Sequence, residues 1–137
     1  MRASVPVRVA DVGGWTDTWF GSPGRVCSLA VGPGVQVDAS VVAGRAAGDA
    51  QVRLVAAVDD TSLLDHAVDA VVEDLDLPSM LSPGAGIDVT ITSAVPPGAS
   101  LGTSASVVVG VLGALDALVG GGARSPADLA VLAHEVE

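Results

Sequence analysis

Positive charge is scarce in this sequence of 137 residues. Lysine is absent, and the six basic residues are arginines that form no cluster, while sixteen Asp and Glu residues bring the formal net charge to −10. Because nucleic-acid surfaces need gathered positive charge, this balance argues against a DNA or RNA partner. An anionic ligand would be held mainly by backbone N–H groups, a helix N-terminus or a metal ion.

Cysteine is nearly absent too. Cys27 is the only one, which excludes an internal disulfide or a thiolate metal cluster and favours a reducing compartment. The start, MRASVPVRVADV, lacks the continuous apolar core of a signal peptide, and the most apolar segment, 107–119, is short and contains Asp116. We therefore expect a cytoplasmic protein with no membrane partner.

Apolar residues make up 50% of the chain, which at this length predicts one folded domain, residues 1–137. The first part of the chain and one later segment have the alternation typical of strands. The expected strands cover residues 5–12, 25–31, 34–42, 51–58 and 87–91. The sequence GPG, residues 32–34, is expected to separate the second strand from the third, and the last strand has one polar face.

Helical periodicity appears in three segments. Residues 61–75 form an amphipathic pattern that ends at Pro78, and the segment after Gly102 is apolar on nearly every side, which predicts a buried helix despite its valines. A last helix is expected to start with Ser125 as N-cap, Pro126 in the first helical position and Asp128 in the first turn.

The stretch PPGASLGTSAS, Pro96 to Ser106, joins the last strand to the buried helix. A strand, a glycine-containing loop and a helix start together present several N–H groups and a helix-dipole end to an anion. Thr103 and Ser104 can add hydroxyl donors, and Ser104 can offer a lone pair to Mg²⁺. A helix N-cap without a ligand is the alternative explanation. The stretch fits neither the Walker nor the dinucleotide-binding pattern.

A second motif, PVRVADVGGWTD, gives the pair a resemblance to the GHMP kinases, the superfamily of galactokinase, homoserine kinase and mevalonate kinase. Pro6, Arg8, Gly13 and Asp17 stand in register with that superfamily's first motif, and PPGASLGTSA resembles its second. The resemblance implies an α/β (α+β) fold with a mixed sheet and packed helices, like the ribosomal protein S5 domain 2-like N-terminal domain of these kinases. It also implies ATP and Mg²⁺ as cofactors.

The resemblance assigns roles to matching residues. Arg8 would lie near the phosphoryl-transfer point, with pairing to a nearby carboxylate as the alternative. Mg²⁺ would be bound by Ser104 and Glu135. Alternatively, Glu137 is the ligand in place of Glu135, or Glu135 is only a solvated carboxylate. Asp17 would bind a substrate hydroxyl. The ATP phosphates would be wrapped by Pro97, Gly98, Ser100, Leu101, Gly102, Thr103 and Ser104.

Two residues depart from the second motif, since Ser100 replaces a glycine and Thr103 a serine. At Ser100 a positive φ would cost about 1 kcal/mol. His66 and His134 are expected to be surface helix residues.

The segment GGWTD bears on the substrate. Gly14 and Trp15 stand where galactokinases have a Glu-His pair, which argues against galactose. This segment resembles the fucose kinase and heptose-phosphate kinase branch, which phosphorylates the anomeric hydroxyl of a sugar or sugar phosphate. Trp15 suits the stacking of an indole on a sugar ring. Trp19 and Phe20 are expected at the rim or in the core, with Phe20 in the core.

The sequence stops within its last helical pattern, AHEVE, without a closing signal. We therefore expect the N-terminal, ATP-binding part of a longer sugar kinase. The resemblance puts the catalytic acid and the C-terminal domain beyond this chain, so that the chain alone would be nearly inactive and would self-associate through the uncovered face. A truncated non-catalytic remnant, or a module that binds a nucleotide or a partner, is the alternative.

Overall fold

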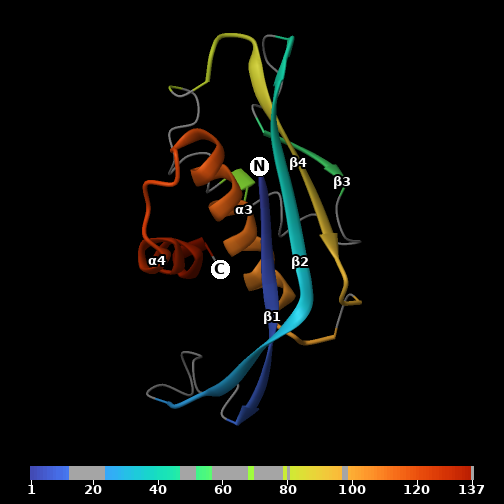
Figure 1. The fold of residues 1–137 in the computed structure, drawn as a ribbon, viewed down its shortest axis with the longest axis vertical. Coiled ribbons are helices and arrows are strands. Elements are labelled where there is room, and N and C mark those ends of the chain that lie inside the picture. Colours follow the sequence, from blue (N-terminus) through green and yellow to red (C-terminus); the bar gives the residue numbers. More distant parts are fainter. Residues whose placement is uncertain are drawn as a thin grey trace.

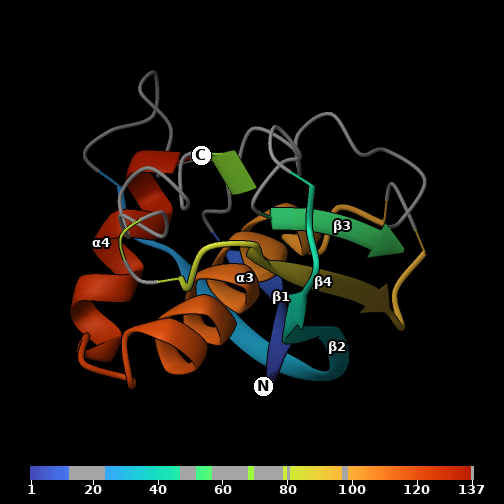
Figure 2. The same ribbon diagram turned by 90° about the horizontal axis from the view of Figure 1, so that it is seen from above.

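In the part of the chain that the structure describes, a four-stranded sheet carries two helices on one face (Figures 1 and 2). The computed structural model describes residues 1–12, 24–46, 52–56, 68–69, 79, 81–96 and 99–136. The strands are β1 (Arg2–Val12), β2 (Cys27–Ala43), β3 (Val52–Ala56) and β4 (Ala85–Ser93), and the helices are α3 (Thr103–Val119) and α4 (Pro126–Val136).

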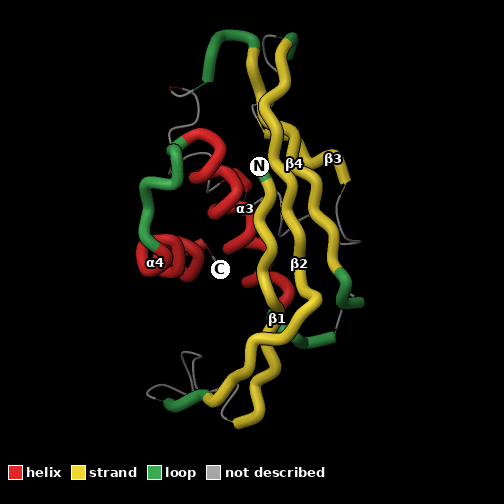
Figure 3. Tube along the Cα trace, viewed as in Figure 1, coloured by secondary structure: helices red, strands yellow, loops and turns green. Residues whose placement is uncertain are grey.

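The sheet is mixed, as expected. Its strand order is β1-β2-β4-β3 (Figure 3). The strand β1 pairs antiparallel with β2, β2 pairs antiparallel with β4, and β3 pairs parallel with β4. The helix α3 packs across β1 and β2, and α4 packs on α3. The predicted fold class, α/β with a mixed sheet and packed helices, is therefore confirmed.

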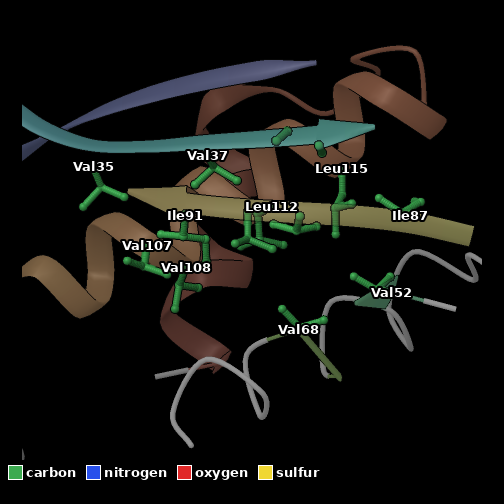
Figure 4. Close-up of a cluster of buried hydrophobic side chains, with 14 of the residues drawn as sticks. Val35, Val37, Val52, Val68, Ile87, Ile91, Val107, Val108, Leu112 and Leu115 are labelled. Atoms are coloured by element: carbon green, nitrogen blue, oxygen red, sulfur yellow. The ribbon is translucent and has the colours of Figure 1, made fainter. Parts of the chain in front are cut away.

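The core lies between the sheet and α3 (Figure 4). Ile87, Val89 and Ile91 of β4 are buried, and the intervening Asp88, Thr90 and Thr92 face the other way, as their alternation predicts. Val107, Val108 and Val111 of α3 are buried as well. Burial on several sides of this helix outweighs the weak helix propensity of branched side chains.

The predicted break at residues 32–34 is wrong, because β2 runs without interruption from Cys27 to Ala43. The pairing instead shifts register between Val5 and Val7 of β1. A Cβ on Gly34 would lie 2.2 Å from the carbonyl oxygen of Val5. The glycine thus allows two backbones to approach closely at a bulge, and the strand continues beyond it.

The helix starts agree with their sequence signals. In α4 the Ser125 Oγ accepts a hydrogen bond of 3.2 Å from Asp128 N, and Ser125 N donates to the Asp128 carboxylate at 3.1 Å. Of the predicted helix 61–75, only Val68 and Asp69 are described; they are helical, with Val68 buried and Asp69 exposed. Neither α3 nor α4 combines the length and the hydropathy that a bilayer crossing would need.

Candidate functional site

The two motifs of the sequence meet where α3 begins. The N–H of Arg8 in β1 donates a 2.9 Å hydrogen bond to the carbonyl oxygen of Leu101. A Cβ on Gly102 would lie 3.5 Å from both Cγ and Nε of Arg8, so the arginine side chain passes over this glycine. The fold therefore brings Arg8, Leu101 and Gly102 into contact.

Gly102 is the N-cap of α3 and adopts a left-handed conformation, φ 65° and ψ 34°, without a side-chain cap. The first N–H groups of a helix have no acceptor within the helix, and the dipole makes this end positive. Thr103 is half-buried and Ser104 is exposed in the first turn. The arrangement suits an anion that is bound by main-chain amides.

Ser100 has a φ of 54°, so the positive φ that was considered for this residue from the sequence is present. A residue with a Cβ is strained in this region, at about 1 kcal/mol relative to glycine. The strain lies in the loop that leads directly into α3, two residues before the left-handed Gly102. Such strain is typical of loops whose shape is fixed by function.

Ser106 is a residue that the sequence analysis did not single out. It is 7% exposed, and its Oγ lies 2.9 Å from the carbonyl oxygen of Pro6 and 3.0 Å from that of Gly102. This hydroxyl therefore connects the start of α3 with β1. The signal that could have found it is a lone polar residue next to the apolar run of α3.

Several predicted site residues lie outside the described residues. These are Gly14, Trp15 and Asp17 of the substrate motif, Pro97 and Gly98 of the loop, and the alternative ligand Glu137, together with Trp19, Phe20 and His66. Glu135 and His134 are exposed on α4. Within the described ranges, no three His, Cys, Asp or Glu residues gather as a metal cluster would require.

Two partly or fully buried carboxylates have structural partners away from this site. Asp116, near the other end of α3 and 2% exposed, lies 3.3 Å from Nη1 of Arg124. On the polar face of the sheet Asp88 pairs with Arg45 and, at 2.9 Å, with Arg53. The hydrogen bond from Arg53 and the charges of both arginines lower the pKa of Asp88. Both carboxylates serve the fold.

A hollow of about 540 Å³ lies at the bulge of β1 and β2, lined by residues 4–6, 32–36 and 92–94. Its lining contains no charged side chain, and no helix starts there. The described residues therefore offer the better anion site at the start of α3.

Comparison with known proteins identifies the family of the chain. A family model described as "GHMP kinases N terminal domain" matches residues 62–137. The mevalonate kinase of Pyrococcus horikoshii is 50% identical over 52 residues, which cover 38% of this chain and 15% of that protein.

Among solved structures, the mevalonate kinase of Methanococcus jannaschii superposes with a TM-score of 0.75 at 18% identity, over 100% of this chain and 45% of that one. A D-glycero-D-manno-heptose 1-phosphate kinase from Bacteriodes thetaiotaomicron gives a TM-score of 0.71 at 19% identity, over 99% of this chain and 47% of that one. These two likenesses establish the fold. The chain spans less than half the length of the relatives it matches.

Proposed function

Because this chain belongs to the GHMP kinases, whose N-terminal domain it carries, we propose that it binds the phosphates of ATP as one wall of a small-molecule kinase. One observation carries the proposal, namely the contact of Arg8 with Gly102 at the N-terminus of α3. Phosphoryl transfer depends mainly on positioning and on stabilisation of charge. The amides from Gly98 to Thr103 and the dipole of α3 would supply most of that stabilisation.

Arg8 would add a positive side-chain charge at this wall. Its backbone is fixed to the loop through Leu101, and its side chain lies against Gly102. A guanidinium held in this way stabilises negative charge that develops on a transferring phosphoryl group. In a chain without lysine, this is the cation that the proposal assigns to the transfer step.

Mg²⁺ fits the loop by the chemistry of its donors. Ser104 presents an exposed hydroxyl in the first turn of α3, and Glu135 presents an exposed carboxylate on α4. Mg²⁺ is usually bound by few protein oxygens together with phosphates and waters, so no protein cage is needed. When bound, the ion would neutralise part of the phosphate charge.

For the acceptor we propose the anomeric hydroxyl of a sugar or sugar phosphate, in the cytoplasm. The segment GGWTD supports this choice, with Asp17 binding the hydroxyl and Trp15, beside Gly14, stacking on the ring. A second acceptor, an acyclic hydroxy acid such as mevalonate, is favoured by the 50% identity to a mevalonate kinase over 52 residues. ADP release, measured with sugars, sugar phosphates and mevalonate on a protein of the relatives' full length, distinguishes the two. Turnover of mevalonate alone would reject the sugar.

Binding of Mg·ATP tests the phosphate wall on the 137-residue chain. Isothermal calorimetry should detect binding by the wild type, and Ser104→Ala should weaken Mg·ATP about tenfold while changing the affinity for metal-free ATP much less. Ser125→Ala, at the start of α4, is the matched control and should leave both affinities unchanged. Equal Mg·ATP affinities of wild type and Ser104→Ala would reject the metal role. Absence of binding by the wild type would reject the phosphate site itself.

A further inference from the structure

The buried hydroxyl of Ser106 has one proton and two carbonyl oxygens within reach. Its Oγ lies 2.9 Å from the oxygen of Pro6 and 3.0 Å from that of Gly102. The Gly102 oxygen already receives the backbone N–H of Ser106 at 3.1 Å. The hydroxyl proton is therefore available to the nearer acceptor, the carbonyl oxygen of Pro6, and links α3 to β1.

Pro6, which accepts this bond, lies at the bulge in β1. Val5 pairs with Val35 and Val7 pairs with Val31, so the register shift leaves Pro6 without a paired residue on β2. A Cβ on Gly34 would lie 2.8 Å from the Cα of Pro6, which shows how tightly β2 packs against this peptide. From the α3 side, the hydroxyl of Ser106 donates to the carbonyl oxygen of Pro6.

This bond joins the two halves of the candidate site. Pro6 stands two residues before Arg8, and Gly102 is the N-cap whose surface the Arg8 side chain covers. The Ser106 bond and the bond from Arg8 N to Leu101 thus join β1 to the start of α3 at two points. We propose that Ser106 is a positioning residue that keeps Arg8 and the first turn of α3 at the separation that ATP phosphates require, an inference that rests on the proposed function.

A serine that serves only stability would give a different result from a positioning residue. Both would lower the melting temperature when replaced by Ala, but only a positioning residue would change nucleotide affinity in the folded protein. Ser125→Ala is the matched control, because it removes a local hydroxyl hydrogen bond at the start of α4. Ser106→Thr keeps the hydroxyl and is the conservative variant.

The test is calorimetric binding of Mg·ATP at a temperature where circular dichroism shows each variant to be folded. Ser106→Ala should weaken binding about three- to tenfold, which is the loss expected for one hydrogen bond. Ser106→Thr should stay within about twofold of the wild type, and Ser125→Ala should bind like the wild type. Wild-type affinity in Ser106→Ala, or equal weakening in Ser106→Ala and Ser125→Ala, would overturn the inference.

The remaining outcomes are also decisive. If Ser106→Ala does not fold, Ser106→Cys fills nearly the same space with a weaker donor. It should then bind about threefold less tightly than Ser106→Thr, and equal affinities would overturn the inference. A wild-type chain that does not bind Mg·ATP would reject the proposed function, whereas a wild type that binds beside an indifferent Ser106→Ala would reject the role of Ser106 alone.

Discussion

Helix α3 contains two glycines three positions apart, in opposite surroundings. A Cβ on Gly110 would lie 2.7 Å from Cγ2 of Val37 and 3.3 Å from Cγ2 of Val5, whereas nothing lies within 4 Å of a Cβ on Gly113. Replacing each by alanine adds the same methyl group to the same helix. The pair therefore separates helix propensity from packing on the sheet.

The two substitutions should change the free energy of unfolding in opposite directions. Alanine exceeds glycine in a helix interior by about 1 kcal/mol, so Gly113→Ala should stabilise by about that amount. At Gly110 the same gain is opposed by overpacking, which costs about 1–3 kcal/mol. Val37 is fully buried and its branched side chain has little freedom to rotate, so we expect a net loss of about 1 kcal/mol.

Thermal and urea unfolding followed by circular dichroism at 222 nm would measure both variants. A difference of about 2 kcal/mol between them corresponds to about 6–10 °C in melting temperature for a chain of this size. In a Val37→Ala background, where the contacting Cγ2 is gone, Gly110→Ala should become stabilising. Equal stabilisation by Gly110→Ala and Gly113→Ala in the wild-type background would refute the packing of α3 on β2 at this distance.

Two further predictions concern the sheet and its charges. Gly34→Ala should destabilise by about 3 kcal/mol or more, because its Cβ would meet the carbonyl oxygen of Val5 at 2.2 Å, and backbone atoms cannot turn aside. Gly32→Ala, whose Cβ meets nothing within 4 Å, should change the free energy of unfolding by less than about 0.5 kcal/mol, and an equal loss in both would contradict the bulge. The hydrogen bond from Arg53 lowers the pKa of Asp88 below its unfolded value of about 3.9, so the stability it contributes is present above that pH and is lost as the pH falls through the lower folded pKa. Urea midpoints should therefore fall as the pH is lowered below about 5 and fall less in Asp88→Asn; the same slope in both would contradict this role.

The sequence correctly predicted the elements that depend on interactions between residues close together in the chain. The start of α4 depends on Ser125 and Asp128, three residues apart, and both hydrogen bonds are present. The polar face of β4 follows from its alternation. The failure at residues 32–34 has a different cause, because whether a glycine breaks a strand or forms a bulge depends on the strand beside it. Gly34 is fixed by the backbone of Val5, which no local pattern reveals.

The candidate site, too, was predicted only in part from the sequence. The loop and Arg8 were found because their motifs resemble those of a known family, and the fold brings Arg8 into contact with Leu101 and Gly102. Ser106 was missed because its acceptor, Pro6, lies 100 residues earlier. The misjudged strand break and the unnoticed serine both involve the bulge of β1, which depends on contacts between residues far apart in the sequence.

The scarcity of positive charge makes this contact important for the proposed chemistry. A lysine with a flexible stem can follow a phosphate that moves, but main-chain amides act only where the backbone places them. With a net charge of −10 and no lysine, the chain would stabilise the charge of a bound phosphate, as proposed, mainly through short-range donors at fixed positions. The strained Ser100, the left-handed Gly102 and the hydrogen bond of Ser106 would all contribute to that placement. In such a site, accurately placed main-chain donors would compensate for the scarcity of positively charged side chains.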